Sequence, residues 1–599
     1  MSRNKYWLLS IGHKEIYGSA GLSLDEIKSE LGRYDLNSML ELSAKIGVIL
    51  FNTAGDISLL QHGQVNMIRS FYDNEAERKD FERRLNQVIY RLQIPKNGWG
   101  LYTKNSILLF LKIALENCPP TGGKPMSLEV APVISKILLS ITDYLNEQDF
   151  QTPKILLPKV EMSRKLREYI FRRLNFSDNQ KYPNPLYRQL KIINFLKAQR
   201  NGAMFAKHFK DATGVSLKTY FEAGAMLTAH WGVPNRDFKL NDAWHVRREY
   251  LSNTKLHKAE VKKLYDLLVF NPDTYESQYA NSVKILSEKD IYTYNYLFLM
   301  QTPLVPILDK LLTCPSPEYL INKVTEGAYR IVSDYLRKGG TQNEELKKKY
   351  NHLPQYWGKA FESYAHLRLK NTFGKNYRKI KEEDRKRADG LFEGKETIIL
   401  FEYKSIHPSY KALITGSAQD LEKPYEQCFG KKHGIVQMTS HAEDIQTGKF
   451  KLRSTLKDKK ILPVLVISEY LPSEPLHYKF FRELLAANLV NYNKNYLLPF
   501  IYLTIEEAEY LEALAAEKNV DELEQLLVDF SRKIHNLDLE NDLSFKNFIF
   551  SKGISVPTNK TIMDGYETYT DKLLRHHFPI EYKKGFPPNK KMPKNGHLS

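Results

Sequence analysis

The sequence is poor in cysteine. Among its 599 residues only Cys118, Cys314 and Cys428 are cysteines. They lie far apart and match neither a CxxC pair nor a Cys/His metal spacing, so neither a disulfide framework nor a zinc site is expected. Few and unpaired cysteines are typical of a reducing compartment, and we therefore expect a cytoplasmic protein.

Long hydrophobic runs are also missing. The residues after Met1 are polar and lead into only a short apolar run, so no signal peptide is expected. The most apolar span, residues 296–312, contains Pro303, Pro306 and Asp309 and is too short to cross a bilayer. We expect a soluble chain without a membrane partner.

Acidic residues are outnumbered by basic ones. The chain has 88 Lys and Arg against 70 Asp and Glu, which gives a formal net charge of +18. Such an excess favours a polyanionic partner, most commonly nucleic acid, and a lysine-coated surface without such a partner is the alternative. At 599 residues the chain is also too long for a single core, so we expect several domains.

Residues 20–60 predict a small helical domain. Ser23 and Glu26 form a capping box before an amphipathic helix, and a second helix is expected over about residues 36–46. The stretch 48–60 predicts two strands about a turn at residues 52–55. This order fits a winged helix, although any small helical domain with a hairpin would show it.

The rest of the chain changes character near residue 340. From about 65 to 340 the pattern is helical, and the polar stretch 337–355 indicates a linker or boundary. From Pro354 onward the order is helix, strand, strand, helix, strand. We therefore expect a multi-domain α plus α/β protein. The predicted division is an N-terminal helical domain (1–95), a helical sensing or gating region (96–340), an α/β domain (341–510), a C-terminal helical region (511–583) and a disordered basic tail (584–599).

The stretch KRADGLFEGKETIILFEYKSIHP, residues 386–408, places charge inside an apolar strand. The run Ile398–Phe401 is followed by Glu402 and, one residue later, by Lys404. Charge that persists in a strand interior is generally paired, metal-bound or catalytic.

The predicted hairpin gathers these charges on one face. A turn at residues 393–396 would place Asp389 opposite Leu400, with Glu402 two residues further along the same face and about 7–8 Å away at Cα. Lys404 points to that face by alternation. Two carboxylates and a lysine so arranged form an oxygen-rich site for a hard divalent cation.

These residues carry a resemblance. Asp389 followed by Glu402-Tyr403-Lys404 resembles the PD-(D/E)xK motif of the restriction-endonuclease-like nuclease superfamily. The preceding WGKAFESYAHLRL resembles the first helix of that superfamily, which supplies a further acid, here Glu362. The resemblance covers about residues 350–510 and implies a restriction-endonuclease-like α/β nuclease core.

The resemblance also implies roles. Asp389 and Glu402 would coordinate Mg²⁺, with Mn²⁺ as an expected substitute, and the carbonyl of Tyr403 would complete the shell. Lys404 would hold the attacking water and stabilise charge at the transition state. Glu362 would orient a metal-bound water or help to hold a second ion.

Two further features surround the motif. Ala388 replaces its leading proline, a residue that contacts neither substrate nor metal in such a site. Gln427, on the following helix, is expected to support the site through a contact with its ligating residues or with the backbone. The connector before the motif is strongly basic, and it is either a phosphate-binding run or a solvated loop. Its candidate nucleic-acid contacts are Arg378, Lys379, Lys381, Arg385, Lys386 and Arg387.

The sequence thus predicts a Mg²⁺-dependent endonuclease. DNA is the favoured substrate because no RNA-stacking motif is present and because the resemblance implies it. Antiphage defence or restriction is the favoured role. The alternatives are a nucleic-acid-binding regulator built on a non-catalytic platform, a DNA-repair nuclease and an RNA-cleaving nuclease. The sequence is compatible with a partner protein and with a homo-oligomer.

Overall fold

The fold is taken from a computed structural model of the chain. It describes residues 9–53, 57–94, 99–150, 184–199, 202–231, 245–286, 292–308, 310–380, 387–415, 426, 434–453, 459–468, 496–535, 544–555 and 557–578.

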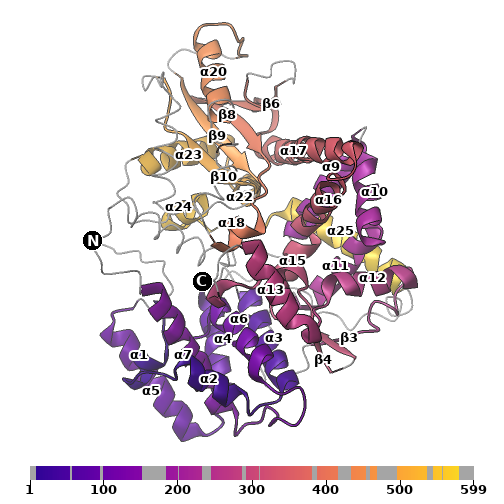
Figure 1. The fold of residues 1–599 in the computed structure, drawn as a ribbon. Coiled ribbons are helices and arrows are strands. Elements are labelled where there is room, and N and C mark those ends of the chain that lie inside the picture. Colours follow the sequence, from indigo (N-terminus) through magenta and orange to yellow (C-terminus); the bar gives the residue numbers. More distant parts are fainter. Residues whose placement is uncertain are drawn as a thin grey trace.

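The described residues between 9 and 150 form a group of helices at one end of the molecule (Figure 1). Side-chain caps begin several of them, as where Asn74 accepts hydrogen bonds from the N–H groups of Ala76 and Glu77. The elements are β1 (Leu9–Ser10), α1 (His13–Tyr17), α2 (Leu24–Leu31), α3 (Leu36–Thr53), α4 (Ile57–Phe71), α5 (Glu75–Arg91), β2 (Trp99–Gly100), α6 (Lys104–Asn117) and α7 (Ala131–Phe150).

The middle of the chain is also mainly helical, but it contains a small antiparallel sheet of order β3-β5-β4 that the helical pattern did not predict. The elements are α9 (Asn184–Ala198), α10 (Gly202–Thr213), α11 (Leu217–Trp231), β3 (Val246–Arg247), α12 (Lys258–Leu268), η1 (Pro272–Thr274), α13 (Tyr275–Leu286), η2 (Tyr292–Tyr294), α14 (Leu297–Gln301), β4 (Val305–Ile307), β5 (Leu311–Thr313), α15 (Pro317–Val324) and α16 (Glu326–Gly339).

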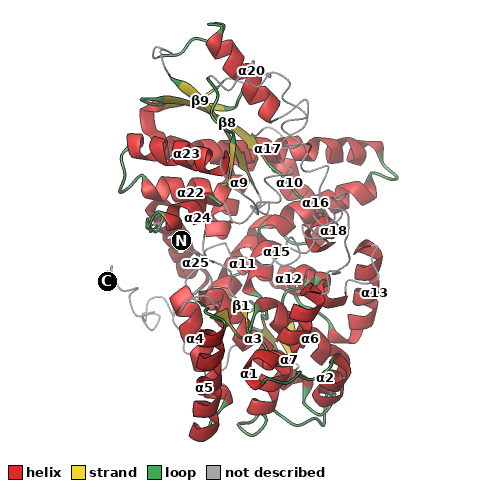
Figure 2. Cartoon of the chain, turned by 90° about the vertical axis from the view of Figure 1, so that its left-hand side faces the viewer, coloured by secondary structure: helices red, strands yellow, loops and turns green. Residues whose placement is uncertain are grey.

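The last part combines a sheet with helices, as Figure 2 shows at the end of the molecule where α20 lies. Its elements are α17 (Glu344–Phe373), η3 (Gly374–Asn376), β6 (Tyr377–Lys379), β7 (Gly390–Glu393), β8 (Thr397–Lys404), α18 (Tyr410–Thr415), α20 (Ile435–Gln446), β9 (Lys460–Ile467), β10 (Ile501–Thr504), α22 (Ile505–Leu514), α23 (Val520–His535), α24 (Phe545–Ser551) and α25 (Lys560–His577).

The sheet has five strands in the order β10-β9-β8-β7-β6. β9 and β10 run parallel to β8, whereas β7 is antiparallel to β8 and β6 is antiparallel to β7. β8 is therefore the central strand, which explains why its apolar run from Ile398 to Phe401 is fully buried. The described chain thus has the expected class of α plus α/β.

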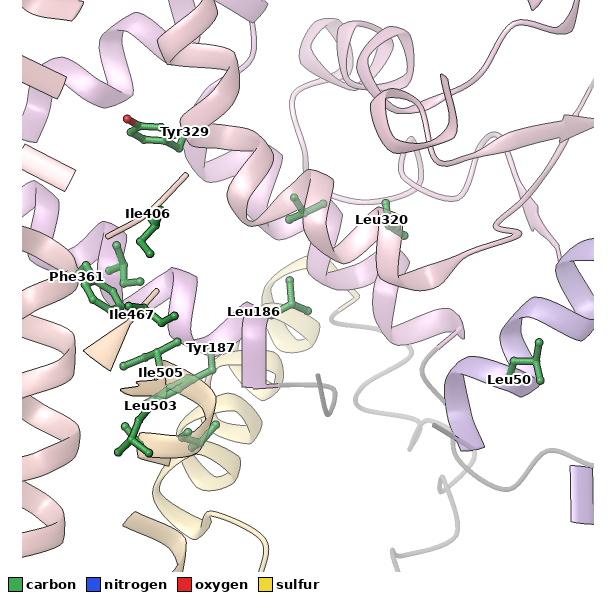
Figure 3. Packing of buried hydrophobic residues seen from close by; sticks show 14 of the residues in the cluster. Leu50, Leu186, Tyr187, Leu320, Tyr329, Phe361, Ile406, Ile467, Leu503 and Ile505 are labelled. Atoms are coloured by element: carbon green, nitrogen blue, oxygen red, sulfur yellow. The ribbon is translucent and has the colours of Figure 1, made fainter. Parts of the chain in front are cut away.

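One hydrophobic cluster runs through the three groups of elements. It includes Leu50 on α3, Leu186 on α9 and Phe361 on α17 (Figure 3). The ring of Trp357 on α17 lies 5.2 Å from that of Phe205 on α10. Apolar packing therefore crosses residue 341, where the sequence predicts a domain boundary.

The predicted hairpin at residues 48–60 is wrong. Residues 48–53 continue α3 and residues 57–60 begin α4, so the winged-helix interpretation loses its wing. The apolar run Val48–Phe51 is buried within a helix, because α3 packs against both α4 and α6. A short apolar run does not distinguish a buried helix from a buried strand.

The predicted linker at residues 337–355 is also mostly helical. α16 ends at Gly339 and α17 begins at Glu344, where Asn343 accepts hydrogen bonds from two backbone N–H groups of the first turn. The ion pair between Lys349 and Glu345, four residues apart on this polar helix, adds support. The predicted helix from Pro354 to Leu369 is therefore part of a longer one.

Among the helices of the described ranges, none is both long enough and apolar enough to cross a membrane.

Candidate active site

The carboxyl end of β8 carries two of the predicted site residues. Glu402 is 1% exposed, and its Oε1 lies 2.7 Å from the Nζ of Lys404. Lys404 also lies 3.3 Å from the Oε1 of Gln437, which comes from α20. The lysine is therefore held between a buried carboxylate and an amide, with its side chain 23% exposed.

The register of the hairpin differs from the predicted one by two residues. Leu391 pairs with Leu400 and Gly390 with Phe401, so Asp389 lies opposite Glu402 rather than Leu400. A shift of two residues keeps every side chain on its predicted face. Asp389 and Glu402 are consequently closer neighbours than expected.

A distant carboxylate explains this register. Glu524 on α23 accepts hydrogen bonds from the N–H groups of Lys395, Glu396 and Thr397 in the hairpin turn, at 2.9, 3.0 and 2.6 Å. The turn therefore begins one residue later than a turn at residues 393–396, and Gly394 donates to the carbonyl of Thr397 across it.

Asp389 is held in place from both sides. Its Oδ2 accepts the backbone N–H of Tyr403 at 2.8 Å. The preceding residue, Ala388, donates its N–H to Nδ1 of His441 on α20 at 3.3 Å. The half-buried carboxylate is thus fixed beside Glu402 before any ligand arrives.

Burial and neighbouring acids raise the affinity of Asp389 for protons. Burial, followed by the charges of Glu402 and Glu362, holds the pKa of Asp389 well above its ordinary value. Burial also raises the pKa of Glu402, although Lys404 opposes this shift. A divalent cation would relieve the same repulsion, which is why such clusters bind metals.

Glu362 approaches from the other face of the sheet. Its Oε1 lies 3.0 Å from Nζ of Lys379 and 3.3 Å from Nε2 of His366. Burial alone would raise the pKa of Glu362, but His366 and Lys379 outweigh it and lower the pKa. His366 also contacts the Tyr377 hydroxyl, which lies 2.7 Å from that of Tyr403.

This arrangement bears on metal binding. Across the described part of the chain, no group of three or more His, Cys, Asp and Glu side chains is placed to hold one ion. Asp389 and Glu402 nevertheless fit a divalent cation, because Oε2 of Glu402 is buried without a hydrogen-bond partner among the described residues. Glu362 would have to leave Lys379 and His366 to join them.

The sequence missed three supporting residues. Gln437, His366 and Glu524 hold Lys404, Glu362 and the hairpin turn, respectively. The spacing of Glu362 and His366, four residues apart on a helix, was a visible signal. Gln437 and Glu524 had none, because their contacts exist only in the folded chain. Gln427, predicted for a supporting role, lies outside the described residues.

Three of the predicted nucleic-acid contacts pair with acidic side chains of the protein itself. Arg378 pairs with Glu393 at 3.2 Å, Arg387 pairs with Asp444 at 3.4 Å, and Lys379 pairs with Glu362. In the absence of a nucleic acid, these three side chains therefore form ion pairs around the candidate site. Three more lie outside the described residues, namely Lys381, Arg385 and Lys386.

Comparison with known proteins yields no matching family model, no matching curated protein and no matching solved structure. The assignment to a nuclease superfamily therefore stays a prediction that depends on the residues of this chain.

Neutralising Asp389 should stabilise the metal-free protein. Because the raised pKa of Asp389 stabilises the folded state at low pH, this contribution is lost as the pH rises through that pKa. Asp389→Asn keeps an acceptor for Tyr403 and has no such dependence. In EDTA, its melting temperature should exceed that of the wild type by an amount that grows as the pH rises above about 4, the ordinary pKa of an Asp carboxyl.

Scanning fluorimetry would measure this difference, with Asp266→Asn at an exposed position of α12 as the control. Mg²⁺ should shrink or reverse the advantage of Asp389→Asn, since only the wild type keeps both carboxylates for the cation. A difference in melting temperature that does not change with pH would contradict the charge cluster.

Proposed function

We propose that the chain is a divalent-metal-dependent endonuclease, with DNA as the favoured substrate. The observation that carries the proposal is the pairing of buried Glu402 with Asp389 across the hairpin, together with Lys404 at the end of the same strand. A protein that only bound nucleic acid would gain nothing from a buried carboxylate and a half-buried one placed side by side, which cost folding free energy.

The residues would divide the work as follows. Asp389 and Glu402 would hold Mg²⁺ or Mn²⁺, which supplies Lewis-acid polarisation of the phosphate and a more acidic bound water. Lys404 would donate to a phosphate oxygen and stabilise the charge that develops there. Gln437 would keep the lysine pointed at the substrate. The carbonyl of Tyr403 and the carboxylate of Glu362 stay candidate contributors to the same site.

The helical part before α17 would sense a signal and gate the candidate active site. α16 contacts the residues that directly follow β8: Nη1 of Arg330 donates to the carbonyl of Pro408 at 2.6 Å. The Tyr329 ring stacks on that of His407 with centroids 4.0 Å apart. A movement of α16 would therefore reach the end of β8. This supports a nuclease whose activity depends on a signal, as antiphage defence or restriction requires, with DNA repair as the alternative.

A cleavage assay tests the proposal. Purified protein would be incubated with plasmid, single-stranded DNA and RNA in Mg²⁺, Mn²⁺ or EDTA, with the double variant Asp389→Asn/Glu402→Gln as the matched control. We expect cleavage of DNA in Mg²⁺ and Mn²⁺, no cleavage in EDTA and none by the double variant. Binding without cleavage under every condition would favour the non-catalytic platform. Cleavage of RNA alone would show that RNA, and not DNA, is the substrate.

A further inference from the structure

A short basic segment follows α20 beside the candidate active site. The basic segment comprises residues 449–453, and Gly448, with φ of +74°, turns the chain into it after the helix. Phe450 and Leu452 pack against the hydrophobic core. The three residues between and beside them are exposed, namely Lys449, Lys451 and Arg453.

The backbone of the basic segment is tied to its surroundings. The N–H of Phe450 donates to the carbonyl of Asp444 at 2.9 Å. Nη2 of Arg378 donates to the carbonyl of Lys451 at 3.1 Å. The N–H of Arg453 donates to the carboxylate of Glu393 at 2.9 Å. The segment is thus ordered at three points without help from a ligand.

Phe450 joins the segment to residues already placed near the site. The guanidinium groups of Arg378 and Arg387 both lie against its ring, 5.0 and 4.9 Å from the ring centroid. The ring of His441 meets it edge-on at 4.5 Å. Arg387 is two residues before Asp389, so the beginning of the basic segment lies next to the carboxylates.

The segment carries three positively charged side chains. Within the described residues, Lys449, Lys451 and Arg453 form no ion pair with a carboxylate. Two acidic residues that accept backbone N–H groups of the segment are already engaged, Glu393 by Arg378 and Asp444 by Arg387. Such an uncompensated charge attracts polyanions and releases their counterions on contact.

We propose that Lys449, Lys451 and Arg453 form a contact surface for the phosphate backbone of a nucleic acid. Phe450 and Leu452 pack against the core whereas Lys449, Lys451 and Arg453 are exposed, so three cations lie within five residues, where neighbouring phosphates of one backbone could contact them. Because the backbone is already fixed, binding orders only the side chains. The inference rests on the proposed function, since it names the surface that holds the substrate of that site.

The test measures DNA binding in EDTA, where neither metal nor cleavage contributes. A labelled duplex would be titrated with wild type and with Lys449→Ser/Lys451→Ser/Arg453→Ser at several salt concentrations, using fluorescence anisotropy. The variant should bind more weakly, and its slope of log affinity against log salt should flatten by about 2–3, close to 0.9 per lost phosphate contact.

The matched control removes the same charge elsewhere. Lys255, Lys258 and Lys262 are exposed residues at α12, which lies away from α20 in Figures 1 and 2. Their replacement by serine should leave the slope within about 0.5 of the wild type, because only contacts change it. An unchanged slope in the segment variant, or equal flattening in both variants, would overturn the proposed surface.

The outcome is separable from the proposed catalysis. If the wild type cleaves DNA but the serine substitutions in the basic segment leave binding unchanged, only the proposed surface is overturned. Segment-dependent binding supports the surface even where Mg²⁺ yields no cleavage, a result that overturns the proposed nuclease instead. Circular dichroism and melting temperature would verify that both serine variants fold as the wild type does.

Discussion

Replacement of Lys404 by alanine should lower divalent-dependent cleavage by about 100- to 1000-fold, the usual loss when one preorganised donor to a developing charge is removed. The ammonium lies 2.7 Å from Glu402 and 3.3 Å from Gln437, so it is fixed before substrate arrives. Alanine removes this group and leaves the backbone pairing of β8 with β9 intact. The rate of plasmid cleavage at saturating Mg²⁺ would measure the loss.

Two companion variants separate chemistry from packing. Gln437→Leu keeps the lysine but removes the amide oxygen that orients it, so a smaller loss of about 10-fold is expected. Lys404→Arg keeps the charge on a longer, planar group and should recover little activity, because the two cations differ in shape. Cleavage by Lys404→Ala at the wild-type rate, with an unchanged melting temperature, would refute the catalytic role of this lysine.

Local patterns predicted the hairpin and its charged face correctly. The apolar run into Glu402 indicated a buried strand, and strict alternation placed Lys404 and Asp389 on the same side. The register itself could not be predicted, because it depends on Glu524, which lies 127 residues away from Thr397 in the sequence. The error of two residues kept the face and changed only which residues lie opposite each other.

The failed hairpin at residues 48–60 has a tertiary cause. The run Val48–Phe51 satisfies a strand pattern as well as a helix pattern, and flanking turn residues favoured the strand. In the fold, the backbone of Pro315 approaches Gly47 so closely that a β-carbon there would lie 1.9 Å from the Pro315 carbonyl oxygen. Pro315 is distant from Gly47 in the sequence, so no local sequence pattern predicts this contact.

The division of the chain at residue 341 stays a prediction, and contacts across that residue are likewise not visible in the sequence. The sequence changes from helical to mixed patterns there, yet α17 packs against α9 and α16 as well as against α22. Composition alone does not show which faces of a helix are shared. Besides apolar packing, charged residues make part of this connection, and their burial could not be expected from sequence.

A buried ion-pair network connects the helical part to the sheet-bearing part. Arg188 on α9 donates two hydrogen bonds to Glu509 on α22, at 2.7 and 2.8 Å, and the Tyr364 hydroxyl of α17 donates to the same carboxylate at 2.7 Å. Beside it, Arg368 on α17 pairs with Glu512 at 2.7 Å. α17, which carries Glu362, is therefore held between the two parts through charges that water does not reach.

Breaking this network should be the most destabilising single change that leaves the candidate active site untouched. Arg188 is 8% exposed and Glu509 is fully buried. Arg188→Met would leave the carboxylate buried, with the Tyr364 hydroxyl as its one remaining hydrogen-bond donor among the described residues. Loss of one member of a buried pair costs about 3–5 kcal/mol, so the melting temperature should fall by several degrees. Hydrogen exchange should accelerate along α9, α17 and α22 together, because the three helices share the lost contact.

Two controls decide whether the buried charge is the cause. The double variant Arg188→Met/Glu509→Leu replaces the pair with apolar side chains and should recover most of the loss, since well-packed apolar residues often replace buried ion pairs without penalty. Arg337→Met breaks the exposed pair with Asp334 and should cost less than about 1 kcal/mol. If Arg188→Met unfolds at the wild-type temperature, or if the double variant is no more stable than the single one, the network does not join the two parts.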